Sequence, residues 1–488
     1  MPVTRRSILH NLGALTSTQV AGRVIRFLYL ALIARFLSAD EVGLYSYGMA
    51  LYLSLLGLGQ LGQGTLLAAR IGRKRSQFAV TAAHSLTILV AGLGLVTAAG
   101  FLLLWLTEPV AAVRHALAFF LLAVLARGFA AWVRNCYVAL ERTTWIPRYE
   151  FAFRGLEALS GIAALGMGAG LLTLCFLHFA FWVVESIASF LLLVRDTGFR
   201  LRLGSDPRLL KRYASISVPI TAGAWLLNLF PQLGIIGLRQ IQPDAADVAH
   251  FAIAMQFLTA LLVLPVSLSQ AILPGLVRAH RNRDEADLMV LLTVLKLCVL
   301  GGTLAAAVSA AVGPWLIAAA FGAHYLPAGE AFASMMWGLG PYSAAFIAAS
   351  ALSALGYRAR ATFAAFLMVA IQGGGMVLLA ELGGLGAVDA AVAAFLLAAL
   401  AGMAWCFRGL TVALGLGDNP RCRGWSLAPT VLLLACAAAG LGDWLEPLWV
   451  MGAGVVLVLA GTALLGVVSR TELAMLLGKA GLRRGILG

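Results

Sequence analysis

The sequence predicts an all-α polytopic membrane protein with about 14 transmembrane helices. Of its 488 residues, 61% are hydrophobic and only 11% are charged, and the mean hydropathy is +0.93. A soluble chain of this length could not bury so much apolar surface, whereas the hydrocarbon core of a bilayer can accommodate it. Long apolar stretches are separated by loops, and along the chain basic loops alternate with loops that contain few charged residues. This alternation is typical of a chain that crosses a membrane repeatedly.

Fourteen apolar stretches are long enough to cross a bilayer, which takes about 20 helical residues. Their centres lie near residues 22, 55, 92, 127, 160, 183, 225, 262, 302, 341, 370, 400, 434 and 457. The longest loop, from Arg195 to about Lys211, is polar and contains glycine and proline, which is typical of a linker. We therefore expect an N-terminal six-helix bundle over 1–195, a cytoplasmic linker over 196–212, a C-terminal six-helix bundle over 213–418, and two additional helices with a cytoplasmic tail over 419–488.

A weak internal repeat supports the division into two halves. The loop after the first span contains Arg35 and Asp40, and the loop after the seventh span contains Arg239 and Asp244, each 204 residues later. Equivalent positions in two related bundles produce such matches, although short matches also arise by chance from the charge pattern of membrane loops. We expect the two bundles to be arranged pseudo-symmetrically.

Lysine and arginine are distributed unequally between the two sides of the expected membrane. With the N-terminus inside, 26 of the 35 basic residues fall in loops on that side, three fall in loops on the other side, and six lie within spans. Such an excess marks the cytoplasmic side. We therefore expect a multi-pass membrane protein with both termini in the cytoplasm. Contact with anionic lipids explains the net charge of +14 without any nucleic acid.

The sequence offers no signature of a cofactor or metal site. Its six cysteines show no CxxC spacing and are expected to be free thiols. No nucleotide-binding motif is present, so we expect no cofactor, and energy for any transport would come from ion gradients or from removal of the product.

Charged residues within the expected spans are the main candidates for function. The first six spans contain five arginines and two glutamates, whereas the second bundle has one clear intramembrane charge, Lys296. A charge at mid-bilayer costs about 2.5–3.5 kcal/mol, so these side chains should face protein, water or a bound anion. Arginine makes forked hydrogen bonds to phosphate and carboxylate. The surplus of arginine therefore predicts a cationic cavity for an anionic group in the first bundle.

Spacing along the helices separates the arginines into groups. Arg127 and Arg134 are seven residues apart and share one helix face, whereas Arg23 and Arg26 lie near mid-span with no acid within a turn. These four are the expected substrate-binding residues. Arg134 also lies near enough to the cytoplasmic end of its span to extend toward the headgroups instead.

The remaining intramembrane charges have both structural and functional interpretations. Arg154, Glu157 and Glu185 are candidates for ion coupling or for a structural ion pair, above all between Arg154 and Glu157. His178 and Glu185 are seven residues apart in one span, as a proton-linked pair would be, or they are a packed histidine and a cavity-lining acid. Asp40 and Glu41 lie in the first external loop, where a membrane glycosyltransferase would place a catalytic acid and where a helix-capping turn is also expected.

The run from Leu32 to Tyr45 combines an apolar stretch, Ala-Arg and a short turn that ends in Gly-x-Tyr. It resembles the start of polysaccharide-type (Wzx-like) flippases of the multidrug/oligosaccharidyl-lipid/polysaccharide (MOP) exporter superfamily, and the layout of six, six and two spans extends the resemblance over nearly the whole chain. The resemblance implies two bundles around a central cavity that work by alternating access. Arg23 and Arg26 match the place where the related lipid II flippases have cavity-facing arginines in the first helix.

The resemblance also implies a function, partners and a location in the bacterial cytoplasmic (inner) membrane. The substrate would be a polyprenyl-pyrophosphate-linked oligosaccharide, as an O-antigen, capsule or exopolysaccharide unit, handled among membrane lipids. A polysaccharide polymerase and glycosyltransferases would be partners, and the protein itself would not be an enzyme. The chain departs from the multidrug branch because its first span has no acid, and from the lipid II branch because its second bundle is poor in intramembrane arginine.

Two alternative functions stay open. A cation- or proton-coupled small-molecule or drug antiporter of the same superfamily would need a buried acid in the first bundle, for which Glu157 and Glu185 are the candidates. A membrane-embedded glycosyltransferase or polymerase would act at Asp40 or Glu41. Such enzymes usually have a large external loop or domain, and this sequence contains none.

Overall fold

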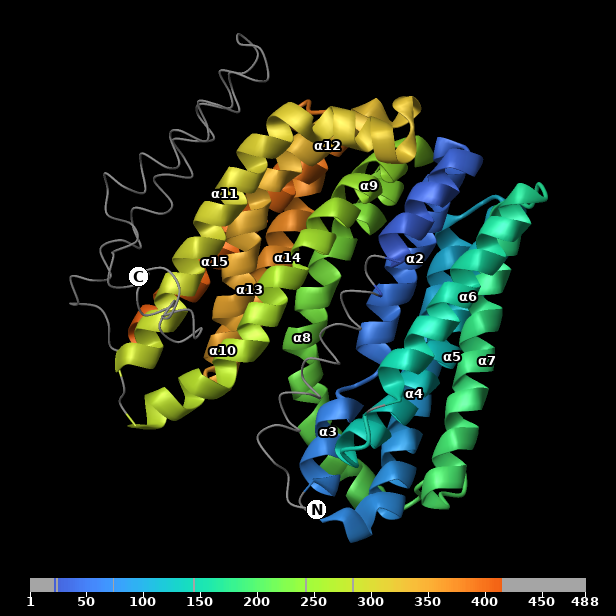
Figure 1. Cartoon of the computed structure of the whole chain (residues 1–488), viewed down its shortest axis with the longest axis vertical. Helices are drawn as coiled ribbons and strands as arrows, with labels where there is room; N and C mark the ends of the chain where they lie inside the picture. The colour runs from blue at the N-terminus through green and yellow to red at the C-terminus, as the bar shows by residue number, and fades with distance from the viewer. Residues whose placement is uncertain are drawn as a thin grey trace, which may run out of the picture. The chain divides into compact units, whose positions relative to one another are not determined.

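Figure 1 shows the fold as a computed structural model, which describes residues 22, 25–72, 74–143, 145–241, 244–282 and 285–414. Within these ranges every regular element is a helix and no strand occurs. The protein is an all-α polytopic membrane protein, so the expected fold class is confirmed. The boundary between its two compact units lies between Ala252 and Ile253. Arg23 and the two helices expected after 419 lie outside the described residues.

The first unit consists of long helices that run beside one another (Figure 1). Residues 25–36 are helical and precede α2. The helices that follow are α2 (Ala39–Gly59), α3 (Gln63–Ile71), the short 3₁₀ helix η1 (Arg75–Gln77), α4 (Phe78–Thr107), α5 (Ala111–Ala139), α6 (Ile146–Gly166), α7 (Leu171–Thr197), α8 (Pro207–Ile241) and α9 (Ala245–Leu261), which crosses the boundary. α5 contacts α2, α4 and α7, and α6 contacts α7. The helices that contain the candidate charges are therefore neighbours.

Aromatic side chains form the centre of the first unit. The rings of Tyr45 and Tyr52 lie 5.4 and 6.3 Å from the ring of Phe120, and Phe120 and Tyr52 are fully buried. Gly48 lets α2 approach α5 at this point, because a Cβ atom there would lie 2.4 Å from the Phe120 ring. Large rings and a small residue at the contact bring the charged faces of the helices close together.

The second unit is built around α13. Its elements are α10 (Val263–Asn282), α11 (Glu285–Phe321), η2 (Ala323–Tyr325), α12 (Leu326–Met335), η3 (Met336–Gly338), α13 (Leu339–Ala354), α14 (Arg358–Glu381) and α15 (Ala387–Leu414). α13 contacts α10, α11, α14 and α15. Gly302 and Gly340 allow the close approach of α11 and α13, because a Cβ atom on Gly302 would lie 2.3 Å from the Gly340 nitrogen.

Nine segments of the described chain are long and apolar enough to span a membrane. Two expected spans differ from the simple pattern. α6 is a full helix where a span near residue 160 was expected, but its four charged residues (Arg148, Glu150, Arg154 and Glu157) make it too polar to count among the nine. The span expected near residue 341 is a broken helix, in which η3 separates α12 from α13.

The expected linker is shorter than the polar composition suggested. α7 continues to Thr197 and α8 begins at Pro207, so only residues 198–206 are non-helical. α8 then contacts α2, α3 and α4 of the first unit. The boundary between the compact units, after Ala252, thus lies farther along the chain than the linker at 196–212 that the sequence predicted as the division. The assignment of six helices to each bundle stays a prediction.

Candidate functional site

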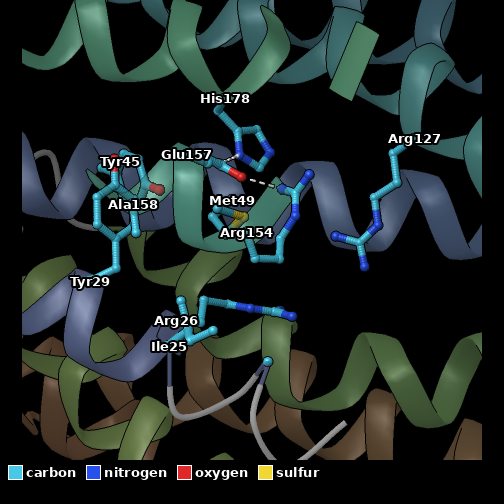
Figure 2. A pocket seen from close by; sticks show the side chains of 11 residues that line it. Ile25, Arg26, Tyr29, Tyr45, Met49, Arg127, Arg154, Glu157, Ala158 and His178 are labelled. Atoms are coloured by element: carbon cyan, nitrogen blue, oxygen red, sulfur yellow. Dashed lines mark hydrogen bonds and ion pairs between the residues drawn. The ribbon is translucent and has the colours of Figure 1, made fainter. Parts of the chain in front are cut away.

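A pocket lies in the first unit among residue 22, residues 25–29, α2, α5, α6 and α7 (Figure 2). It contains about 440 Å³ of space that no protein atom occupies, part of which is open to the surroundings. Its lining residues are Gly22, Ile25, Arg26, Tyr29, Tyr45, Met49, Arg127, Arg154, Glu157, Ala158 and His178. Three of these are arginines and one is a carboxylate, so the lining carries an excess of positive charge.

Four buried or nearly buried residues form an ionic cluster on one side of the pocket; we call Arg154, Glu157, His178 and Glu185 the α6–α7 cluster. Arg154 of α6 forms ion pairs with Glu157, one turn further along α6, and with Glu185 of α7. The Nδ1 atom of His178 lies 2.6 Å from the Oε1 atom of Glu157. The side chains of Glu157 and Glu185 are 8% and 6% exposed, so the arginine compensates two buried acids at once.

The cluster shows which of these residues contact one another, while a role in ion coupling stays a prediction. The structural ion pair expected between Arg154 and Glu157 is present. Of the two interpretations of His178 and Glu185, a packed histidine agrees with the structure, because His178 is buried. The proton-linked pair is not observed, since His178 contacts Glu157 across the α6–α7 interface while Glu185 binds Arg154. Glu185 is not among the residues that line the pocket. Spacing along one helix cannot reveal the partner of His178, since it belongs to another helix.

Two of the arginines, Arg154 and Arg127, pack against the ring of Trp182 of α7. The guanidinium carbon of Arg154 lies 3.7 Å from the centre of the Trp182 ring, and that of Arg127 lies 4.6 Å from it. Arg127 also donates a hydrogen bond of 3.1 Å from Nη1 to the hydroxyl of Tyr52. No carboxylate of the described residues forms an ion pair with Arg127. Its charge is therefore held in place by aromatic groups and is not neutralised by an acid there.

Arg26 lines the same pocket from the helical residues that precede α2. Its side chain is exposed, and Figure 2 shows it on the opposite side of the pocket from His178. Of the four expected substrate-binding residues, Arg26 and Arg127 are thus brought to one pocket. The two arginines are 101 residues apart in the sequence, and both line this pocket.

The other two expected binding residues are not in this pocket. Arg134 forms an ion pair of 2.8 Å with Glu150, and both side chains are partly exposed. Arg134 is not among the lining residues, because it lies two turns further along α5 than Arg127. Arg23 lies outside the described residues, so its role stays a prediction.

The excess of positive charge at the site is smaller than the excess of three that was predicted by counting the charged residues within the first six expected spans. Within the described part of the pocket and cluster, Arg26, Arg127 and Arg154 face Glu157 and Glu185, which leaves one positive charge in excess. The expected surplus of three included Arg23, which is not described, and Arg134, which Glu150 compensates. The count missed Glu150 because it lies near the start of α6.

The sequence reasoning missed the role of Trp182. His178, Trp182 and Glu185 follow one another at intervals of four and three residues, which is the spacing of a single helix face. Those intervals indicate that the three side chains share the surface of α7 that faces α6. They do not indicate that arginines from two other helices meet on the indole ring.

The turn before α2, which the sequence places in the first expected external loop, forms a helix cap. The backbone nitrogen of Glu41 donates to the Ser38 hydroxyl, and the Glu41 carboxylate accepts a hydrogen bond of 3.1 Å from the Ser38 nitrogen. This reciprocal pattern is a capping box at the start of α2. The capping interpretation of Glu41 is therefore confirmed, and Asp40 lies exposed beside it.

Comparison with known families and structures agrees with the fold. A family model described as polysaccharide biosynthesis protein matches residues 8–280, which is more than half of the chain. No curated protein sequence matches. Among solved structures, the lipid II flippase MurJ in an inward closed conformation has a TM-score of 0.66 at 11% identity, over 92% of this chain and 98% of that chain.

Exporter structures are also similar. An inward-facing multidrug resistance MATE family transporter of the MOP superfamily has a TM-score of 0.63 at 16% identity, over 83% of this chain and 99% of that chain. A mutant of the Vibrio cholerae MATE transporter VcmN has a TM-score of 0.59 at 15% identity, over 85% of this chain and 98% of that chain. At such identities these structures establish the fold alone. The chain belongs to the polysaccharide biosynthesis protein family and has the fold of the flippases and exporters of the MOP superfamily.

Proposed function

We propose that the protein is a flippase that moves a polyprenyl-pyrophosphate-linked oligosaccharide across the bacterial cytoplasmic membrane. The observation that supports this most directly is Arg127, which lines the pocket against Trp182 and Tyr52 with no ion-pair partner among the described carboxylates. A guanidinium oriented in this way presents N–H donors to a pyrophosphate. Membership of a polysaccharide biosynthesis family supports a glycan as the rest of the substrate.

In this proposal the charged residues of the pocket have different roles. Arg26 and Arg127 bind the pyrophosphate, while Arg154 holds the two glutamates of the α6–α7 cluster and lies against the same indole ring as Arg127. The polyprenyl tail stays in the bilayer, and the sugars occupy the open part of the pocket. O-antigen, capsule and exopolysaccharide units all share the pyrophosphate group that this site recognises. Glycosyltransferases supply such a substrate, and a polymerase consumes it.

The first test compares the sidedness of lipid-linked glycan in cells that lack the protein. We expect glycan to accumulate on the cytoplasmic face, and the wild-type chain to clear it. Arg26→Ala combined with Arg127→Ala should not clear it, because the pyrophosphate then loses both guanidinium groups. Arg358→Ala combined with Arg408→Ala is the charge-matched control, since both arginines are exposed and lie in the second unit. This control should rescue as well as wild type.

Two results would contradict the proposal at different levels. Normal sidedness in cells without the protein would overturn flipping itself. Full rescue by the Arg26 and Arg127 double variant would leave flipping intact and overturn the assignment of this pocket.

Trp182 offers a finer test of how the site is organised. Trp182→Leu should lower the flipping rate about tenfold, because two cation–π contacts of about 0.5–1 kcal/mol each are lost and Arg127 is no longer oriented. Trp182→Phe keeps an aromatic face and should lose about threefold or less. The rate is measured as the appearance of glycan at the outer surface. Equal losses in both variants would show that the ring acts through packing alone.

A cation- or proton-coupled small-molecule antiporter is the second candidate. The contact of His178 with the buried Glu157 supports it, since such a pair can exchange a proton with the pocket. Uptake of a fluorescent organic cation into inverted vesicles with an imposed proton gradient tests it, with Glu157→Gln as the variant. Gradient-dependent uptake that Glu157→Gln abolishes would favour this candidate over the flippase.

A further inference from the structure

The segment between α7 and α8 is held firmly at its start. α7 ends at Thr197, and Gly198 adopts a left-handed conformation with φ of 66° that turns the chain away from the helix axis. The next residue, Phe199, is 3% exposed, and its ring lies 5.8 Å from Phe78 of α4 and 5.9 Å from Trp132 of α5. The chain is thus anchored in the first unit immediately after α7.

The same segment is held again five residues later. The backbone nitrogen of Gly204 donates to the carbonyl of Ala83, and its carbonyl accepts from the hydroxyl of Thr87 at 3.0 Å. A Cβ atom on Gly204 would lie 2.4 Å from the ring of His84, so only glycine fits without displacing that ring. Both backbone groups of one residue are therefore fixed to the surface of α4.

Four exposed residues lie between these two attachment points. Arg200, Leu201, Arg202 and Leu203 are all exposed, and the two leucines have exposed fractions of 61% and 59%. We call these four residues the Arg-Leu strip. The structure gives neither arginine an ion-pair partner within the described chain. Two apolar and two cationic side chains are thus presented together on a backbone that is fixed on both sides.

The contacts with α4 indicate the depth of the strip in the membrane. α4 has 30 residues and is about 45 Å long at 1.5 Å per residue, whereas the hydrocarbon core is about 30 Å thick. A centred helix therefore extends about 7 Å beyond the hydrocarbon at each end. Gly204 bonds to Ala83 and Thr87, which lie about 7.5 and 13.5 Å from the start of α4 at Phe78. The strip thus lies near the boundary between headgroups and hydrocarbon.

Neighbouring residues strengthen the positive potential there. The first turns of α8 present Arg208, Lys211 and Arg212 to the surroundings. The nearby carboxylate of Asp206 accepts a hydrogen bond of 2.9 Å from the nitrogen of Arg208 and so caps α8. Anionic headgroups suit this field, and a hydrocarbon boundary suits the two leucines. An acidic soluble protein would satisfy the arginines but not the leucines.

We propose that the Arg-Leu strip is a membrane-interface anchor that binds anionic phospholipid. Arg200 and Arg202 bind the lipid phosphates, and Leu201 and Leu203 enter the apolar boundary beneath them. Because the strip is fixed to α4 and joins α7 to α8, a bound lipid ties the ends of three helices to the bilayer. The anchor is separate from the pocket and does not depend on the proposed flippase activity.

Native mass spectrometry of the intact protein tests the anchor, with phosphatidylglycerol or phosphatidylcholine titrated into a neutral detergent. We expect wild type to prefer phosphatidylglycerol. Arg200→Gln with Arg202→Gln should weaken phosphatidylglycerol binding at the tightest site about 30-fold, at ~1 kcal/mol for each arginine. Phosphatidylcholine binding should be unchanged. Arg358→Gln with Arg408→Gln removes the same charge elsewhere and should change the affinity less than threefold.

A second pair of variants separates the two halves of the anchor. Leu201→Ser with Leu203→Ser should weaken the binding of both lipids while keeping the preference for phosphatidylglycerol. Only ions of the folded protein are counted, so misfolded material does not enter the comparison. Three results would overturn the proposal: no lipid preference in wild type, wild-type affinity after loss of Arg200 and Arg202, or an equal loss in the Arg358 and Arg408 control.

Discussion

Arg154→Met is expected to lower the free energy of unfolding by about 3–5 kcal/mol, which is the usual cost of removing one partner from a buried ion pair. The arginine binds both Glu157 and Glu185, whose side chains are 8% and 6% exposed. Methionine fills much of the volume but leaves two buried carboxylates without the cation that compensates them. Thermal unfolding of the purified protein measures the effect, and the same variant should fail to clear glycan from the cytoplasmic face.

Two matched variants identify the cause of that loss. Adding Glu157→Gln and Glu185→Gln to Arg154→Met removes the uncompensated charges and should restore most of the lost stability. Arg75→Met breaks the ion pair between Arg75 and Glu141, whose side chains are 64% and 55% exposed respectively. This variant should lower the free energy of unfolding by less than about 1 kcal/mol. If the triple variant is no more stable than Arg154→Met, the two carboxylates are not the reason for the effect.

The fold class follows from the sequence because hydropathy alone specifies membrane helices. Two features of the helices did not follow from it. α6 is less apolar than a typical span, since Arg154 and Glu157 compensate each other inside the protein and need no water. The segment 198–206 has the composition of a linker, but Phe199 and Gly204 hold it against α4 and α5. A polar composition predicts that a segment is exposed to solvent. It does not predict contacts such as these, which depend on single residues.

The candidate site was predicted in part, for a related reason. A charge within a span must be compensated, so Arg26, Arg127, Arg154 and Glu157 were identified from position alone, and the structure brings all four to one pocket. Partners on other helices were not identified, because they depend on how each helix is rotated about its axis. Spacing within one helix therefore left a pair of His178 with Glu185 open as one alternative, whereas His178 contacts Glu157 in the structure.

A second buried ion pair lies at the C-terminal end of α4, whereas η1 precedes its N-terminal end. Two nitrogens of Arg239, Nε and Nη2, donate to the two carboxylate oxygens of Glu108 at 3.0 and 2.9 Å. The side chains of Glu108 and Arg239 are 2% and 15% exposed. Beside them, Gln240 donates to the hydroxyl of Tyr47 at 3.1 Å. The last turn of α8 is thereby joined to both α4 and α2.

Glu108→Gln is expected to lower the free energy of unfolding by about 3 kcal/mol, because the amide can accept only one of the two hydrogen bonds and carries no charge to compensate the guanidinium. Glu108→Met combined with Arg239→Met replaces the pair with apolar side chains of similar size, and should be nearly as stable as wild type. Thermal unfolding of the three proteins in one detergent makes the comparison. If the double variant loses as much stability as Glu108→Gln, then the pair matters for the bond it forms between α4 and α8. If the double variant is stable, the cost of Glu108→Gln comes from the buried charge left behind, and packing against α2 and α4 is enough to hold α8 in place.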